Sequence, residues 1–201
     1  TYFYFTIFEI SIVTFLLAIS GAIAQFPVGK ISDFYDRRKV IIVSTFGAAM
    51  FAVFTIFVSG QMYLPDGLAT SKTWFYIFFI FFSFCSLPMF SLILAHTNDY
   101  ITKDKFVAAG AGLQFVFGLG AISGPFLCSI FMNIVGSNGF FIFLFFFHSL
   151  IGVFGIYRMR IRPTIENPDS QFVAMPQTIT PAGIELNPTT EPIEEPIKEE
   201  N

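Results

Sequence analysis

The sequence predicts an all-α membrane protein: a transmembrane domain with five membrane-spanning helices, followed by a disordered tail. Hydrophobic residues make up 54% of the 201 residues, and charged residues only 12%. Soluble domains carry about 25% charged residues, so an ordinary water-facing surface is excluded. Residues 1–162 hold ten Lys or Arg against six Asp or Glu, whereas residues 163–201 hold one Lys against eight acids. We therefore divide the chain into a transmembrane domain, 1–162, and an acidic tail, 163–201.

Five apolar runs are each long enough to cross a bilayer. A helix needs about 20 mostly apolar residues to span the hydrocarbon layer. The runs lie at about residues 8–28, 40–62, 73–97, 106–135 and 139–157. The cluster Gly136-Ser137-Asn138 separates the last two runs and predicts a turn. Strands of a barrel alternate apolar and polar residues, whereas Phe75–Phe82 is apolar throughout, so the runs are predicted to be helices.

The basic residues predict how the helices are oriented. The segments 29–39 and 98–105, with the residues after the last span, hold nine Lys or Arg, whereas the opposite loops hold only Lys72. Positive charge favours the cytoplasmic side. The first span is therefore expected to enter from outside, and the tail is expected to lie in the cytoplasm. Because the first residue is Thr, we expect the natural N-terminus to lie further upstream.

The tail at 163–201 is expected to be disordered. It contains seven Pro and too few apolar residues to offset the entropy of the chain. A contact between its acidic end and a partner is the alternative. Cys85 and Cys128 lie in spans and indicate neither a disulfide framework nor a metal site. No pattern of a metal cluster, a nucleotide-binding loop or a catalytic triad is present, so we expect no cofactor, no bound metal, no nucleic acid and no enzymatic activity.

The segment 29–39, called the charged segment below, carries the most specific signal. Its candidate functional residues are Gly29, Lys30, Asp33, Asp36, Arg37 and Arg38. A loop that only sets topology needs cations and has no use for the two acids. A carboxylate followed by arginines can form charge-assisted hydrogen bonds that join two helix ends. Pro27, just before this segment, is expected to disturb the last turn of the first span.

The charged segment resembles the signature loop of the major facilitator superfamily, Gly-x-Leu-small-Asp-Arg-x-Gly-Arg-Arg/Lys. The matching positions are Gly29, Ile31, Ser32, Asp33, Arg37 and Arg38, whereas Phe34 and Asp36 stand where the family has Arg and Gly. In that family the loop latches the cytoplasmic side when the transporter faces outward. The resemblance makes Asp33 the latch carboxylate.

The resemblance also implies an architecture and a function. The five spans would be helices eight to twelve of a twelve-helix transporter, in which two bundles rock about a central site. Its partners would be the lipid bilayer, the N-terminal half of the same transporter and a small organic solute. An ion gradient would supply the energy. The stretches Gln25–Asp33 and Ala95–Asp99 resemble a bacterial, drug-transporter-like subgroup, which implies a bacterial inner membrane.

A glycine-rich stretch in the fourth span has two possible roles. Gly118, Gly120, Gly124 and Pro125 could form a flexible rocking element, or they could simply let helices pack closely. The stretch resembles the Gly-x-x-x-Gly-Pro motif of facilitator antiporters. That resemblance suggests an exporter.

Polar residues inside spans often mark a pathway. Gln114 and His148 could contact a substrate, and His148 could relay protons, or each could hydrogen-bond a neighbouring helix. His96, Asn98 and Asp99 end the third span and are expected to cap and latch the next loop, with Asp99 pairing with a nearby Lys or Arg. Two other functions remain open: a five-span sensor or assembly protein, and a nonfunctional remnant of a split transporter gene. A membrane enzyme ranks behind both, because the sequence lacks the usual clustered His, Asp or Glu residues.

Overall fold

The computed structural model describes residues 5–61, 68–102, 105–161, 172 and 174, and within them the chain is helical. The helices are α1 (Ile7–Phe34), α2 (Arg37–Gln61), α3 (Leu68–Ser86), α4 (Met89–Asn98), α5 (Phe106–Val135) and α6 (Gly139–Ile161). Since α3 and α4 form one continuous span, five stretches are long and apolar enough to cross a membrane. The predicted fold class is confirmed.

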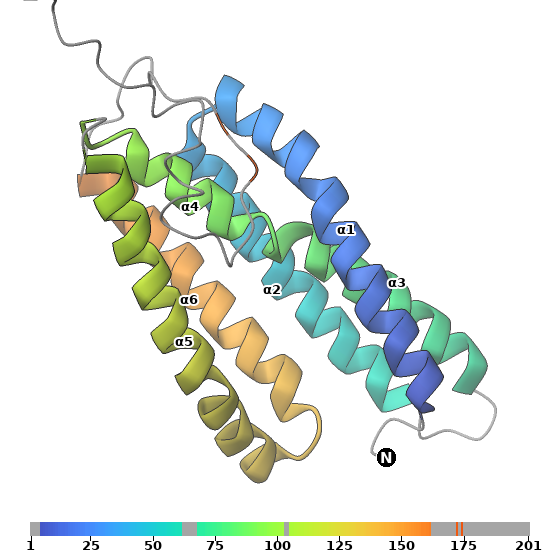
Figure 1. Ribbon diagram of the computed structural model, residues 1–201. Helices are drawn as coiled ribbons and strands as arrows, with labels where there is room; N and C mark the ends of the chain where they lie inside the picture. Colours follow the sequence, from blue (N-terminus) through green and yellow to red (C-terminus); the bar gives the residue numbers. More distant parts are fainter. Residues whose placement is uncertain (1–4, 62–67, 103–104, 162–171, 173, 175–201) are drawn as a thin grey trace, which may run out of the picture.

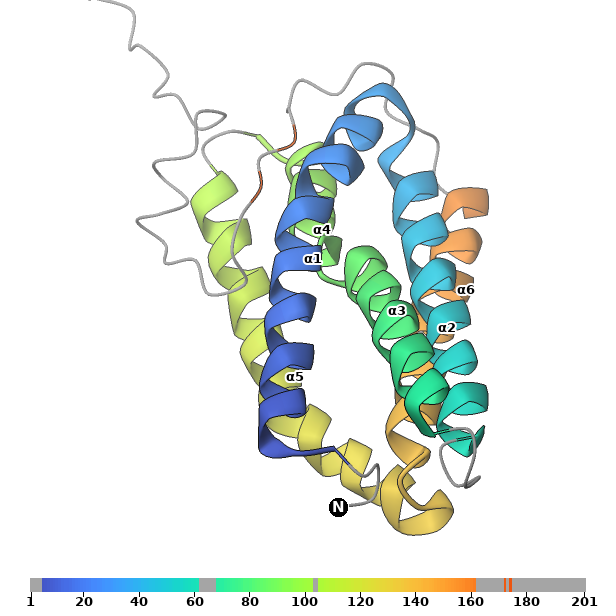
Figure 2. The ribbon, with the colours of Figure 1, turned by 90° about the vertical axis from the view of Figure 1, so that its right-hand side faces the viewer.

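Helix α2 lies at the centre of the bundle, between α3 and α6, while α1 packs against α3 and α5 against α6 (Figure 1 and Figure 2). Small residues give α2 this place, since Ala48 and Ala52 are almost fully buried and permit close helix approach. Thr45 and Thr55 are also fully buried, and their hydroxyls donate to carbonyls of their own helix at 2.8 to 3.0 Å. These bonds satisfy polar groups that hydrocarbon would leave unpaired.

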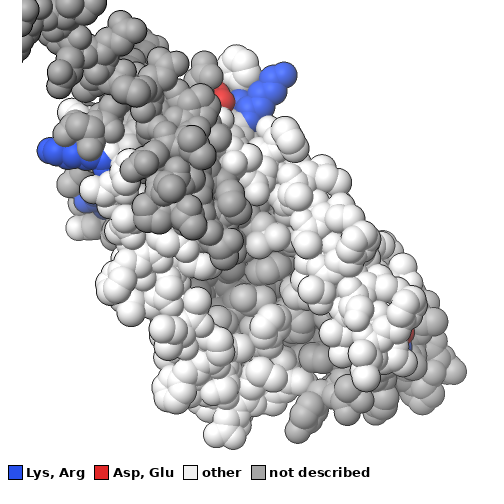
Figure 3. Space-filling view, viewed as in Figure 1, with Lys and Arg blue, Asp and Glu red and all other residues white. Residues whose placement is uncertain are grey.

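The outer surface of the bundle is apolar. Large side chains on three different helices are about two thirds or more exposed, among them Phe8 74%, Phe26 79%, Phe115 69%, Phe126 68% and Phe57 70%. On the face shown in Figure 3, the blue Lys and Arg side chains gather at one end and the long sides are white. A soluble protein rarely exposes so large an apolar surface. The chain is therefore an integral membrane protein.

We call the end of the molecule where the Lys and Arg side chains gather the basic end. It contains the last turns of α1, α4 and α6 and the first turns of α2 and α5. Its described basic residues are Lys30, Arg37, Arg38, Lys39, Lys105, Arg158 and Arg160. The opposite end holds an aromatic cluster of Phe5, Phe75 and Phe141, beside which Lys72 pairs with Glu9 at 2.8 Å.

Helix α1 is longer than the sequence suggests. The prediction that Pro27 disturbs the last turn is wrong, because Pro27 lies inside a helix that continues to Phe34. Proline removes one hydrogen bond, but the following turn is held both by its own side chains and by α2. Ser32 is buried and donates to the Gly29 carbonyl of the same helix at 2.7 Å, and Asp33 is bound by Arg37 of α2. Most of the charged segment is thus helix rather than loop.

The third span is not one straight helix. It breaks at Leu87 and Pro88, between α3 and α4. Pro88 has no N–H to donate, so the hydrogen-bond ladder is interrupted there and resumes when Leu92 donates to the Pro88 carbonyl at 3.0 Å. The predicted turn between α5 and α6 is present, and Gly136 adopts a φ of 81°, which favours glycine. The predicted disorder of 163–201 concerns residues outside the described part, except Phe172 and Ala174.

Candidate functional site

The site lies at the basic end, where α1 turns into α2 over only Tyr35 and Asp36. Asp36 caps α2: its Oδ1 accepts from the Arg38 backbone N–H at 3.0 Å, and its carbonyl accepts from Lys39 at 2.8 Å. An aspartate before the first helical residue satisfies N–H groups that have no partner within the helix. Asp36, which replaces the glycine of the family motif, is thus the residue that starts α2.

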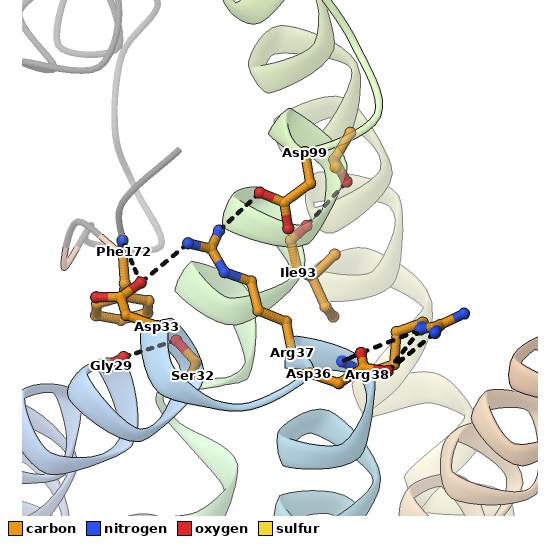
Figure 4. A network of polar contacts seen from close by, with 10 residues as sticks. Gly29, Ser32, Asp33, Asp36, Arg37, Arg38, Ile93, Asp99 and Phe172 are labelled. Carbon is orange, nitrogen blue, oxygen red and sulfur yellow. Dashed lines mark hydrogen bonds and ion pairs between the residues drawn. The ribbon is translucent and has the colours of Figure 1, made fainter. Parts of the chain in front are cut away.

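An ion-pair chain joins three helix ends (Figure 4). Arg37, at the start of α2, donates from Nη2 to Asp33 Oδ1 of α1 at 3.0 Å. It also donates from Nη1 to Asp99 Oδ1, just after α4, at 3.2 Å. The side chains of Arg37 and Asp99 are only 3% and 6% exposed, whereas Asp33 is 35% exposed. The sequence predicts a basic partner for Asp99, and the structure supplies Arg37.

Arg38 points away from the Asp33–Arg37–Asp99 ion pairs and binds Asp36 (Figure 4). Its Nη2 lies 2.9 Å from Asp36 Oδ2, and its Nε lies 3.1 Å from Oδ1. The two arginines therefore act separately. Arg37 links neighbouring helices, whereas Arg38 fixes the turn that begins its own helix. Lys30 has an exposed side chain and makes no hydrogen bond or ion pair with the described residues.

One member of the site comes from the tail and was not predicted. The backbone N–H of Phe172 donates to Asp33 Oδ1 at 2.8 Å. The Phe172 ring lies against Gly29, where a Cβ atom would overlap it, and it packs on the buried cluster of Val28, Val40 and Leu92. A signal existed in the sequence, since Phe172 is the only aromatic residue between 163 and 201. The proline-rich, acidic composition of the tail nevertheless predicted disorder, so Phe172 was not singled out.

The end of α4 contributes three predicted residues, which do not form one face. Asp99 binds Arg37, and the His96 ring meets the Tyr100 ring edge-on with centroids 5.1 Å apart. Asn98 is buried, and its Oδ1 has no hydrogen-bond partner among the described residues. The described residues contain no group of three or more His, Cys, Asp or Glu placed to hold a metal ion.

Helix α5 does not pack the glycines of its predicted rocking element against another described helix. A Cβ atom built on Gly118, Gly120 or Gly124 would meet no described atom within 4 Å, and α5 continues through Pro125. Close packing by these glycines therefore does not occur within the described bundle. Gln114, on the same helix, has a buried Oε1 without a hydrogen-bond partner among the described residues. The structure does not bring Gln114 together with His148.

His148 makes the interhelical bond that was the alternative to a pathway role. Its Nε2 lies 2.9 Å from Ser86 Oγ of α3, and its Nδ1 lies 2.8 Å from the Leu144 carbonyl of its own helix. Both ring nitrogens thus have partners. The ring also meets Phe82 edge-on, with centroids 5.3 Å apart. His148 lies between α3 and α6, away from the basic end.

Comparison with known proteins agrees with the resemblance of the charged segment. An uncharacterized MFS-type transporter of Yersinia enterocolitica is 25% identical over 156 residues, which cover 78% of this chain and 35% of that protein. The uncharacterized MFS-type transporter YfkF of Bacillus subtilis is 27% identical over 140 residues, which cover 67% of this chain and 32% of that protein. No solved structure matches the chain significantly.

The chain spans about a third of the length of these curated relatives. The family model described as Major Facilitator Superfamily matches residues 1–194, which is nearly the whole chain. Five apolar spans and the ion-pair chain at the charged segment fit that match. The chain belongs to the major facilitator superfamily.

Proposed function

We propose that this chain forms helices eight to twelve of a twelve-helix secondary active transporter. The transporter moves a small organic solute across a bacterial cytoplasmic membrane by alternating access, in the direction of export and coupled to an ion gradient. The basic end faces the cytoplasm, as nine Lys or Arg against one on the opposite side favour. The coverage of about a third of each relative supports a place within a longer protein, and the C-terminal position rests on the resemblance of the charged segment.

The ion-pair chain Asp33–Arg37–Asp99 is the observation that carries this proposal. It fixes the α1–α2 turn to the end of α4, with Arg37 between two carboxylates at 3.0 and 3.2 Å. The Arg37–Asp99 pair is buried, and removing one partner from such a pair is costly. Asp33 is one third exposed, so its carboxylate can also accept a donor from a second bundle. The Arg37–Asp99 pair is thus permanent, whereas the donor bound to Asp33 can be exchanged.

An exchangeable carboxylate suits a gate that opens and closes. Alternating access requires contacts that form at one end of the molecule in one state and separate in the other. A charge-assisted hydrogen bond to Asp33 is strong enough to hold the closed state and can still be replaced by another donor. The Phe172 N–H supports this role, since it is a second donor to Asp33 Oδ1 beside Arg37.

The open face of α5 supports a second bundle beside this one. A Cβ atom added to Gly118, Gly120 or Gly124 would meet no described atom within 4 Å. Glycines allow close helix approach in a bilayer, so this face suits the contact with the N-terminal half. The resemblance of Gly118–Pro125 to the antiporter motif is the basis for the direction of export.

A transport experiment tests the proposal. The gene is deleted and restored in its natural full length, and accumulation of a panel of small organic solutes is compared. We expect at least one solute to accumulate on deletion, and Asp33→Asn to lower its export roughly tenfold, the size of one lost charge-assisted hydrogen bond. Membrane insertion of the variant should stay normal.

Each outcome has a definite reading. If deletion changes the accumulation of no solute in the panel, the transporter assignment loses its support. If Asp33→Asn is inserted normally and exports at the rate of the unchanged protein, transport stands but the exchangeable role of Asp33 is wrong. Arg160→Gln serves as a control for the loss of an exposed charge at the same end of the molecule, because Arg160 has no described partner.

A further inference from the structure

A cavity of about 260 Å³ opens at the basic end, and none of Asp33, Arg37 and Asp99 is among its lining residues. It is lined by Arg38 of α2, by four residues at and beyond the end of α4, and by Arg158 of α6. The four are His96, Thr97, Tyr100 and Ile101. The cavity thus lies where three helices end, and none of the functions proposed above uses it.

The described residues of the lining are rich in hydrogen-bond donors and include no carboxylate. Arg38 already binds Asp36, and the Thr97 hydroxyl donates to the Ile93 carbonyl of its own helix. Arg158, His96 and Tyr100 differ, because their side chains make no hydrogen bond or ion pair with the described residues. A guanidinium, an imidazole and a phenol around one space fit a ligand that is anionic and rich in acceptor oxygens.

On α6 itself, Arg158 has exposed apolar neighbours. Phe154 and Ile161 lie four residues before and three residues after it, so the three side chains share one face of α6. Phe154 is 59% exposed and Ile161 is 56% exposed. An anion at Arg158 would therefore have an apolar surface directly beside it. An anion that carries its own apolar chain could bind the donors of the cavity and also cover the apolar side chains beside Arg158.

We propose that the cavity binds the phosphate headgroup of an anionic phospholipid, with an acyl chain along Phe154. The phosphate accepts from Arg158, with Arg38, His96 and Tyr100 around it, and so connects α2, α4 and α6. Basic pockets between transmembrane helices suit such headgroups. The proposal requires that the chain lies in a membrane and does not depend on transport.

Arg160 provides a matched control. It is two residues from Arg158, carries the same charge on the same turn of α6, is exposed and does not line the cavity. If the arginines only attract anionic lipid through their charge, the two positions should be equivalent. If the cavity is a site, they should differ.

The experiment measures lipid retention by the protein in its natural full length. Wild type, Arg158→Gln, Arg158→Lys and Arg160→Gln are reconstituted in phosphatidylcholine bilayers with added phosphatidylglycerol, purified in mild detergent and analysed by native mass spectrometry. We expect Arg158→Gln to retain about tenfold less phosphatidylglycerol, as for the loss of one charge-assisted hydrogen bond. Arg160→Gln should retain as much as wild type, and Arg158→Lys should lie between them.

Two results would overturn the proposal. One is equal retention by Arg158→Gln and Arg160→Gln, which would leave only a diffuse effect of charge. The other is displacement of phosphatidylglycerol by inorganic phosphate alone, which would identify a site for a soluble anion rather than a lipid. A thermal melt of each variant shows whether it is folded, and a misfolded Arg158→Gln leaves the comparison of Arg158→Lys with Arg160→Gln as the deciding one.

Discussion

Phe172 of the tail donates its backbone N–H to Asp33, at 2.8 Å, on the same oxygen that accepts from Arg37. Two donors from parts of the chain that are far apart in sequence therefore meet on one carboxylate. One donor belongs to the adjacent helix and the other to a segment beyond the last span. The contact places part of the tail against the charged segment that carries the family resemblance.

The two carboxylates on Arg37 should be energetically coupled. We expect Asp99→Asn to destabilise the protein by about 3 kcal/mol, because it leaves a buried guanidinium poorly compensated. Asp33→Asn should cost about 1 kcal/mol, since Asp33 is 35% exposed. The double variant should lose more stability than the sum of the two single variants, because the effects of residues that share a partner are not additive. Unfolding in detergent measures all three, and strictly additive losses would contradict the shared role of Arg37.

The docking of Phe172 should depend on the absence of a side chain at position 29. Gly29→Ala places a Cβ atom where the Phe172 ring lies, whereas Gly112→Ala meets no described atom within 4 Å. With Cys85 and Cys128 replaced, a spin label at Ala174→Cys reports the mobility of this segment. We expect Gly29→Ala and Phe172→Ala to mobilise the label and Gly112→Ala to leave it unchanged. An immobile label in Gly29→Ala would show that the ring is not seated there.

Two glycines should separate packing within this bundle from packing against a second one. A Cβ atom on Gly152 would lie 2.8 Å from the Phe46 ring, so Gly152→Leu should destabilise α2–α6 packing by about 1–3 kcal/mol. Gly124→Leu meets no described atom and should leave the stability of this bundle nearly unchanged, yet it should impair transport by the intact protein. Thermal melts and transport rates measure the two effects. Normal transport by Gly124→Leu would argue against the α5 face as a contact surface.

Gln114 should affect solute affinity rather than stability. Its buried Oε1 has no partner among the described residues, so Gln114→Leu costs this bundle no described hydrogen bond. We expect it to raise the KM for transport about tenfold, as for one lost hydrogen bond to a solute. Ser123→Ala is the control, because the Ser123 hydroxyl already donates to the Leu119 carbonyl of its own helix at 2.9 Å. An unchanged KM in Gln114→Leu would remove Gln114 from the pathway.

His148 should behave as a structural residue. Its hydrogen bond to Ser86 joins α3 to α6 at 2.9 Å. We expect His148→Phe and Ser86→Ala each to destabilise the protein by about 1 kcal/mol, with little further loss in the double variant. The dependence of transport on pH should keep its shape in His148→Phe. A lost or displaced pH optimum in this variant would instead favour the proton relay.

Several features of the charged segment could be read from the sequence, because they depend on residue type and spacing. Asp33 and Arg37 are four residues apart, and Asp99 follows an apolar span, so charge pairing near these helix ends was expected. The sequence could not predict which arginine joins the helices, since Arg37 and Arg38 are adjacent and chemically identical. The direction in which each side chain leaves α2 decides it: Arg37 faces α4 and is 3% exposed, while Arg38 turns to Asp36.

By itself the sequence determined that the protein crosses the membrane in five helical spans, because apolar length and the scarcity of charge are local properties that hydrocarbon demands of any segment. It also identified the charged segment and the turn at Gly136. Only the tertiary structure decided that α1 continues through Pro27, that Phe172 reaches Asp33 and that α5 leaves Gly118, Gly120 and Gly124 uncovered by the described bundle. Each of these depends on contacts between residues distant in sequence, and such contacts can offset or conceal what the local pattern favours.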